Sequence, residues 1–349
     1  MLPIYTQNDA NLPYRKVITF AILMLLTLSG CSREITKPGN QVKEMPAFSI
    51  PPDLTVGVIV AEGKNAKVSP SRKYRGTLET IQENGKSIVV NRVAIDDYVK
   101  GVMNGEVSPS WPEESLRAMA IVIRSYAFNR WENARASKSH MYSDVRSQEY
   151  CGQSCEDPRS NKAVDETAGL VMFHDGKVLQ AFSHACCAGR TENAREVWGS
   201  DEAGDCFIEK DCQWCRSSKH FGPWMLILEK STLSRRLSAD IGKGLTLKSI
   251  KVIDRNESGR VKTVEVSTIW KKVRMSGAHF RSLVGWNDVR SARFEITDRG
   301  DLIEIIGTGW GHGVGLCQEG AKKMAEEKMD YESILRYYFP GMEIWRIPR

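Results

Sequence analysis

The segment from Gly307 to Gly315 carries a glycine at every second position, with Trp310 and His312 among the residues between them. Alternate glycines are unfavourable in a helix and in an ordinary strand, because each one adds backbone entropy and contributes no side chain to packing. Directly after them, apolar residues recur at helical spacing: Val314, Cys317, Ala321, Met324 and Ala325. The sequence therefore predicts a glycine-rich turn that feeds a helix and lets the backbone around His312 approach another group closely. From this segment alone, a tight loop without a function explains the glycines equally well.

Two further helices are predicted between residues 96 and 127. Asp96 or Asp97 can cap a short helix that ends near Gly105, and both aspartates read as caps rather than as a second catalytic carboxylate. Pro112 occupies a first-turn position of the second helix. That helix carries an apolar stripe that we expect to be buried: Leu116, Met119, Ala120, Ile123, Tyr126 and Ala127. Arg124 falls on its polar side.

Glu106 lies where these two helices meet, in the kink from Gly105 to Pro109. Its sequence neighbours Met103, Val107 and Trp111 are apolar. A carboxyl group that such neighbours desolvate has a raised pKa, which is what a general acid needs at neutral pH. From the residues alone, the commoner interpretation is a glutamate on a solvated surface turn.

The rest of the chain reads as strands and short helices. Five runs predict strands: Leu54–Val60, Ser87–Val90, Gly169–Phe173, Val178–Phe182 and Val261–Val266. A last helix is predicted over Ser333–Phe339, capped by Asp330 and stopped by Pro340. We therefore expect an α+β fold with mixed and antiparallel sheets and a few helices.

The N-terminus resembles a bacterial lipoprotein signal. Arg15 and Lys16 precede the apolar stretch 17–28, which is too short to span a bilayer about 30 Å thick as a helix. Leu28-Ser29-Gly30-Cys31 then matches a lipobox, in which Cys31 becomes the lipidated first residue. We therefore predict a signal peptide over 1–30 and a proline-containing membrane tether over 31–53. This places the protein in the cell envelope, outside the cytoplasm and anchored by lipid.

The charge balance favours an anionic partner. The chain has a formal net charge of +6, and removal of residues 1–30 leaves +5. A modest positive excess suits a wall polymer or a membrane surface. It is too diffuse for nucleic acid, and no basic block with interleaved aromatic residues is present.

Eight cysteines remain beside Cys31. An even number outside the cytoplasm favours disulfides. The pair Cys212 and Cys215, together with His184 and Cys187, has ligand types and spacing suited to tetrahedral zinc. Free buried thiols are the third interpretation, and Cys317 is expected to belong to the core.

Three ordered motifs carry a resemblance to a known family. They are the segments 97–112, 183–199 (Ser183 to Thr191, then Glu196 to Gly199) and 307–321. In this order they resemble the stage II sporulation protein D family and the related amidase-enhancer proteins, over residues 54–345. Three positions depart from the family pattern: Asn104 replaces a small residue, Ala188 a glycine and Glu319 an aromatic residue.

The resemblance implies a lytic transglycosylase that cleaves peptidoglycan strands stripped of stem peptides and leaves 1,6-anhydro-muramic ends. Glu106 matches the family's catalytic glutamate, and Arg124 matches a family arginine. Arg124 is expected to hold Glu106 or substrate, and Trp310, His312 and Gln318 are expected to contact substrate. No cofactor is expected for catalysis, although some family members hold a structural zinc. The alternative is a wall-binding protein without catalysis that activates a cell-wall amidase, in division, sporulation or turnover.

Overall fold

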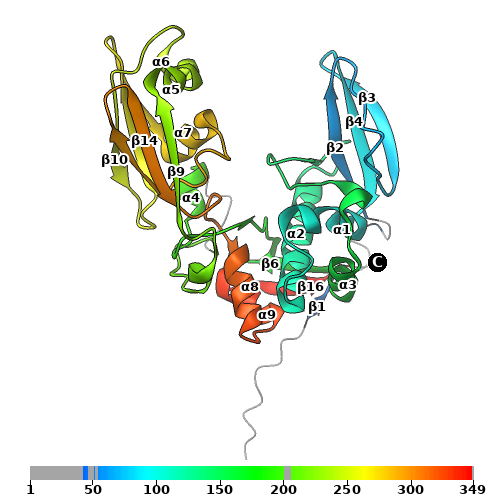
Figure 1. Ribbon diagram of the computed structural model, residues 1–349. Coiled ribbons are helices and arrows are strands. Elements are labelled where there is room, and N and C mark those ends of the chain that lie inside the picture. The colour runs from blue at the N-terminus through cyan, green and yellow to red at the C-terminus, as the bar shows by residue number, and fades with distance from the viewer. Residues whose placement is uncertain (1–41, 46–50, 52–53, 200–205, 348–349) are drawn as a thin grey trace, which may run out of the picture. The chain divides into compact units, whose positions relative to one another are not determined.

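The computed structural model describes residues 42–45, 51, 54–199 and 206–347 (Figure 1). These residues belong to one unit, Val42–Arg349. The predicted signal peptide 1–30, Cys31 and most of the predicted tether 31–53 lie outside the described residues. In the part of the chain that is described, no helix is both long and apolar enough to span a membrane.

The fold is α+β, as predicted, with several small sheets. The first sheet has the order β3-β4-β2-β5 and consists of β2 (Thr55–Gly63), β3 (Thr77–Glu83), β4 (Lys86–Ala94) and β5 (Met141–Tyr142). Strands β2, β3 and β4 pair antiparallel, whereas β5 joins β2 in parallel. The predicted strands Leu54–Val60 and Ser87–Val90 are therefore confirmed, and both extend further along the chain.

Three helices follow this sheet: α1 (Ile95–Glu106), α2 (Glu113–Asn133) and α3 (Pro158–Glu166). All six predicted stripe residues of α2 are buried. The predicted cap of α1 is wrong, because no side chain caps this helix. Asp96 and Asp97 lie inside the first turn of α1, where carboxylates interact favourably with the helix dipole. Pro112 is the residue before α2 rather than a residue of its first turn.

A second sheet joins the two ends of the described chain. Its order is β1-β16-β6-β7, with β1 (Lys43–Glu44), β16 (Glu343–Arg346), β6 (Leu170–His174) and β7 (Lys177–Val178). Part of the predicted tether thus pairs in parallel with β16. The predicted strand Val178–Phe182 is wrong beyond Val178, since residues 179–182 are irregular. The chain then enters β8 (Ser183–His184), which pairs in parallel with β15 (Leu316–Cys317).

Helix α4 (Ala194–Trp198), α8 (Gln318–Glu326) and α9 (Tyr331–Tyr338) complete this part of the chain. The predicted cap of α9 is confirmed, since the Asp330 side chain accepts a hydrogen bond from Ser333 N. Residues 54–222 and 309–347 share one large hydrophobic core and are called the motif region below.

Residues 223–308, called the insert below, have a hydrophobic core of their own. They form the sheet β13-β14-β9, from β9 (Pro223–Glu229), β13 (Phe294–Asp298) and β14 (Leu302–Thr308). A second sheet has the order β10-β11-β12, from β10 (Ser249–Arg255), β11 (Val261–Ser267) and β12 (Lys272–Ser276). The helices are α5 (Lys230–Arg236), α6 (Ser238–Ile241) and α7 (Gly277–Val284). Strand β11 confirms the prediction over Val261–Val266.

Candidate active site around Glu106

Glu106 is the last residue of α1, and Val107 after it is extended, so the helix ends in the predicted kink. Its carboxylate is half-buried. Oε1 accepts a hydrogen bond from the backbone N–H of Glu149 at 3.2 Å, and Oε2 accepts one from Nε2 of Gln318 at 3.0 Å. Both donors are neutral, so neither of them holds the carboxylate in its charged form by an opposite charge.

Burial raises the pKa of Glu106 above its ordinary value of 4.5, and the nearby Glu149 charge raises it further. The hydrogen bonds from Glu149 N and from Gln318 oppose this rise without cancelling it. The raised pKa keeps the carboxyl group protonated to higher pH than a solvated glutamate. That is the state from which it can donate a proton.

Gln318 reaches Glu106 from the other end of the chain, because it is the first residue of α8 and follows β15 directly. Pairing of β15 with β8 brings Ser183 alongside, and Nε2 of Gln318 lies 3.5 Å from Ser183 Oγ. The structure thus joins the first and last sequence motifs at a single carboxylate, with the middle motif beside them.

His312 lies within an aromatic group next to this contact. Its Nδ1 accepts a hydrogen bond from Val314 N at 3.0 Å, which leaves the proton on Nε2 in the neutral ring. Burial lowers the pKa of His312 well below 6.5, and His184, Arg281 and Arg260 lower it further, against a backbone hydrogen bond with Ser183. His312 is therefore neutral at physiological pH and can act as a hydrogen-bonding group rather than as an acid.

The alternating glycines give this loop its path. Gly309, Gly311, Gly313 and Gly315 all have positive φ, where a side chain is strained. A Cβ at Gly313 would come within 2.5 Å of Cζ of the buried Arg260. The predicted close approach of the backbone is confirmed. The predicted helix begins later than its periodicity indicated, at Gln318, so Val314 and Cys317 precede it.

Trp310 has a partly exposed ring in the same loop. The ring of His220 meets it edge-on at 5.0 Å, and the Arg290 guanidinium lies 4.8 Å from its centroid. Phe182, Trp198 and His312 form a neighbouring aromatic group, in which Trp198 is 45% exposed. These rings supply the flat apolar faces on which sugar rings stack. The predicted substrate contacts of Trp310, His312 and Gln318 remain predictions.

The placement of Arg124 on a polar helix face is wrong. Its side chain is fully buried, because α1, α3, α9 and β6 all pack around α2. Its Nε donates to Asp96 Oδ1 at 2.6 Å, and its terminal nitrogens donate to the carbonyls of Leu170 and Val164. A buried guanidinium with these bonds ties helices together and is not accessible for binding substrate.

The zinc ligands predicted from spacing stay a prediction. Three of them, Cys187, Cys212 and Cys215, lie together with Cys317, whose expected place in the core is confirmed. His184 is buried, with its Nδ1 3.0 Å from Val314 O and its Nε2 without a hydrogen-bond partner among the described residues. The predicted disulfides are represented by one bond, Cys151–Cys155, among the described residues. The other six described cysteines beside this disulfide are buried: Cys186, Cys187, Cys206, Cys212, Cys215 and Cys317.

Sequence reasoning missed two further parts of the site. Ser183 lies in the middle motif, but nothing in its type indicated contact with Gln318. Glu149 lies in no motif, and it reaches Glu106 because Gly105 leaves room: a Cβ there would be 2.4 Å from Glu149 O. A hollow of about 430 Å³ lies elsewhere, between residues 188–190, Asp211, Arg216, Phe221 and Arg293, and Glu106 does not line it.

Comparison with known proteins places these features in a family. The sequence profile of the stage II sporulation protein family, SpoIID, matches residues 83–174, which contain α1, α2 and Glu106. Stage II sporulation protein D of Bacillus subtilis is 25% identical over 308 residues, 81% of this chain and 85% of that protein. An uncharacterized protein of Brachyspira hyodysenteriae is 32% identical over 287 residues, 82% of this chain and 76% of that protein. The chain belongs to the SpoIID family.

Two further similarities qualify this membership. The amidase enhancer of Bacillus subtilis is 24% identical over 285 residues, 70% of this chain but only 39% of the enhancer's length. Residues 200–315, which contain the insert, match a domain family of unknown function, DUF8618. The SpoIID profile therefore covers part of the motif region, and the second profile covers the insert together with residues 200–222 and 309–315 of the motif region.

Proposed function

We propose that this SpoIID-family protein is a peptidoglycan lytic transglycosylase in which Glu106 acts as both acid and base. The observation that carries the proposal is the environment of one carboxyl group. It is half-buried, has a raised pKa and is held by two neutral donors, Gln318 Nε2 and Glu149 N. The match of residues 83–174 to the family profile supports the assignment of this glutamate.

The chemistry needs only this group and the substrate. Protonated Glu106 gives its proton to the glycosidic oxygen, and the bond from that oxygen to C1 of the muramic acid breaks. The 6-hydroxyl of the same sugar then attacks C1 and loses its proton to the Glu106 carboxylate. The products are a new non-reducing end and a 1,6-anhydro end, and Glu106 is protonated again.

The neighbours of Glu106 fit these two roles. The Gln318 amide donates to Oε2 in both protonation states, so the carboxylate formed after proton transfer stays oriented. Neutral His312 supplies a hydrogen-bonding group, and Trp310 and Trp198 supply aromatic faces. A glycan strand without stem peptides offers flat sugar faces and the free lactyl carboxylate of each muramic acid. The rings can stack on the sugar faces, and Arg290 beside Trp310 supplies a cation for the carboxylate, so we propose such strands as the substrate.

Hydrolysis of the glycosidic bond is a competing reaction, because a second carboxylate, Glu149, lies close enough for its charge to raise the pKa of Glu106. Hydrolytic glycosidases use two carboxylates, whereas the transglycosylase reaction uses one. Glu149→Gln is therefore the matched control for Glu106→Gln, since both remove a charge and keep the side-chain shape. Only in a hydrolase would both be essential.

The test is digestion of purified peptide-free glycan strands with mass analysis of the ends. We expect anhydro ends from the wild type, loss of at least about 10²–10⁴ in rate for Glu106→Gln, and nearly full activity for Glu149→Gln. Reducing ends that need both carboxylates would identify a hydrolase. Full cleavage by a folded Glu106→Gln variant would move the active site elsewhere.

A second candidate function is activation of a cell-wall amidase, which the similarity to a protein named amidase enhancer favours. In that case, the Trp310 and Trp198 faces would bind the wall without cleavage. Wild-type protein that leaves glycan strands intact but accelerates an added amidase on intact walls would establish this function instead.

Both functions place the protein in the cell envelope, which agrees with the names of its sporulation and amidase-enhancer relatives. We propose that Cys31 is lipidated and anchors the chain to a membrane. Cys31→Ala is expected to abolish incorporation of labelled fatty acid and partitioning into detergent. Acyl chains on the substituted protein would exclude this anchor.

A further inference from the structure

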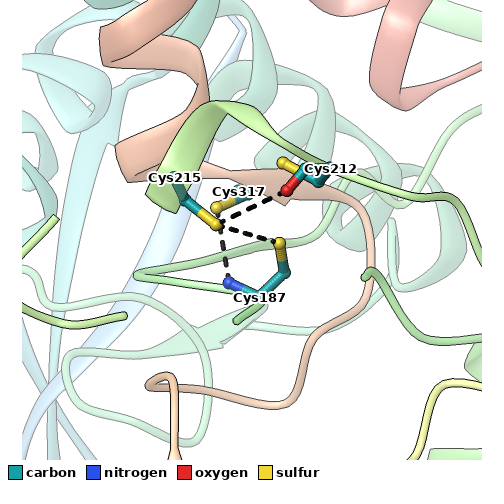
Figure 2. Close-up of side chains that lie close together, drawn as sticks. All are labelled: Cys187, Cys212, Cys215 and Cys317. Carbon is teal, nitrogen blue, oxygen red and sulfur yellow. Dashed lines mark hydrogen bonds between the residues drawn. The ribbon is translucent and has the colours of Figure 1, made fainter. Parts of the chain in front are cut away.

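Four buried thiols converge beside the active site. The Sγ atoms of Cys187, Cys212, Cys215 and Cys317 all lie within 4.8 Å of one another, and all four residues are fully buried (Figure 2). They come from three separate segments: the loop after β8, the turn at residues 212–215 and strand β15. Packing of ordinary core residues does not require four sulfurs from three segments to point at a single centre.

The geometry points to a zinc ion bound by Cys187, Cys212, Cys215 and Cys317. With zinc–sulfur bonds of about 2.3 Å, the sulfurs of a tetrahedral site are separated by about 3.8 Å. Cys187 Sγ and Cys215 Sγ are 3.4 Å apart, near that spacing and well beyond a disulfide bond of about 2.05 Å. Four sulfurs around one centre also fit one ion better than two separate disulfides. Tetrahedral sites of four thiolates select zinc among the common divalent ions.

The surroundings can accommodate the negative charge of four thiolates. Tyr338 Oη lies 3.3 Å from Cys212 Sγ, and the Cys187 N–H donates to Cys317 Sγ at 3.4 Å. The fully buried Arg260 guanidinium donates to the Cys187 carbonyl at 3.0 Å, which brings a cation to the cluster. Hydrogen bonds and charges of this kind stabilise bound thiolates. Gly320 leaves room for this contact, because a Cβ there would clash with Tyr338 Oη and lie 3.2 Å from Cys212 Sγ.

The proposed ion would fix the backbone that positions Gln318. Cys317 is the residue before Gln318, whose side chain holds Glu106 at 3.0 Å. Strand β15, with Cys317, pairs with β8, so the ion and the active site share one two-stranded ribbon. We therefore assign the zinc a structural role, with Gln318 as a positioning residue. This second step rests on the proposed function, whereas the metal site does not.

Metal analysis of the purified full chain tests the site directly. We expect about one zinc ion per chain, lost in Cys212→Ser and in Cys317→Ser. His184→Ala and Cys186→Ser are the matched controls, since both residues are buried nearby but lie outside the four, and both variants should keep the ion. Zinc that survives in Cys317→Ser but disappears in His184→Ala would overturn the proposed ligand set.

A measurement on the wild type guards against variants that fail to fold. Alkylation followed by mass mapping should leave all four thiols unmodified in the native protein and modify them after chelation without a reductant. Absence of metal, with thiols that react only after reduction, would overturn the proposal in favour of disulfides. Glycan cleavage is recorded separately, so loss of zinc with intact cleavage would reject only the positioning of Gln318.

Discussion

The motif region and the insert differ in their buried polar groups and in the regularity of their backbones. Residues 223–308 contain no cysteine, whereas the motif region holds six buried cysteines among its described residues. The motif region also contains the run of positive-φ glycines, and the insert consists mainly of regular antiparallel strands. The region with the irregular backbone is the one that contains the candidate active site.

Two glutamates make this difference concrete. In β11 of the insert, Glu265 has a side chain only 5% exposed, with Arg274 at 3.0 Å, Lys251 at 3.6 Å and Lys272 at 3.9 Å. The hydrogen bond from Arg274 and these charges lower the pKa of Glu265. Glu106 has neutral donors instead, and burial raises its pKa. A carboxylate surrounded by cations is held in one state, whereas Glu106 can exchange a proton.

Buried arginines show a similar contrast. Arg124 in the motif region is paired with the Asp96 carboxylate. Arg281 in the insert donates Nε to the Val289 carbonyl at 2.6 Å and stacks on Trp286 at 4.6 Å. Burial lowers the pKa of Arg281 to about 10, and the Arg260 charge lowers it further. The two side chains therefore leave different groups behind when they are removed.

The largest predicted effect is Arg124→Ala, which should lower the free energy of unfolding by about 3–5 kcal/mol, because it leaves the Asp96 charge and two carbonyls without their partner. Arg281→Ala should cost about 1–3 kcal/mol, because it leaves only carbonyls. Urea unfolding of both variants measures the difference. If Arg281→Ala loses as much free energy of unfolding as Arg124→Ala, the Arg124–Asp96 ion pair adds nothing to the stability of the motif region.

A smaller effect is predicted in the pH dependence of two matched variants. The folded-state pKa of Glu106 is raised, so its ionisation destabilises the protein increasingly as pH rises from about 4.5 through that pKa. Glu106→Gln should therefore gain stability relative to wild type between pH 4 and pH 8. Glu265 has a lowered pKa and stabilises the protein above its unfolded pKa, so Glu265→Gln should lose stability over the same interval.

Urea unfolding at pH 4, 6 and 8 checks both signs. The change with pH is the readout, because Glu106→Gln also places an amide beside Glu149 N and alters one hydrogen bond at every pH. If the free energy of unfolding changes with pH in the same way in both variants, the neutral surroundings of Glu106 and the cationic surroundings of Glu265 do not shift the two pKa values in opposite directions.

The sequence predicted those features of the fold that depend only on neighbouring residues. The α9 cap at Asp330 and the buried stripe of α2 follow from capping chemistry and from the helical period, and both are confirmed. The position of Arg124 did not follow, because a periodicity identifies one buried face and cannot show that α2 is covered on the other faces too.

The candidate active site could not be predicted in the same way, because it is built from residues that are far apart in the sequence. Glu106 and Gln318 are 212 positions apart and were linked only through the family resemblance. Cys317 was assigned to a helix face because its spacing fits that helix, whereas α8 begins one residue later and leaves its thiol beside Cys187. Ligand spacing along the chain favoured His184 as a zinc ligand, whereas the structure groups Cys317 of β15 with the other three thiols.

The smallest predicted effect concerns backbone strain at Ala188, the position where the family pattern has glycine. Ala188 has φ of 57°, which costs a residue with a side chain about 1–2 kcal/mol. Ala188→Gly should relieve this strain, while the added entropy of glycine offsets about 0.5–1 kcal/mol of the gain. Loss of one buried methyl group offsets more, so we expect a net stabilisation of about 0.5 kcal/mol or less.

The insert offers the reverse change at Gly259, with φ of 79° and Arg293 Cζ 3.8 Å from an added Cβ, an ordinary contact. Gly259→Ala should therefore cost about 1 kcal/mol from the backbone alone. Thermal unfolding of both variants measures the pair. Opposite signs would show that the same φ penalty operates in both regions and that the motif region tolerates it at Ala188. If Ala188→Gly destabilises the protein as much as Gly259→Ala does, packing of the Ala188 methyl group outweighs the strain, and the alanine is the better residue at this turn.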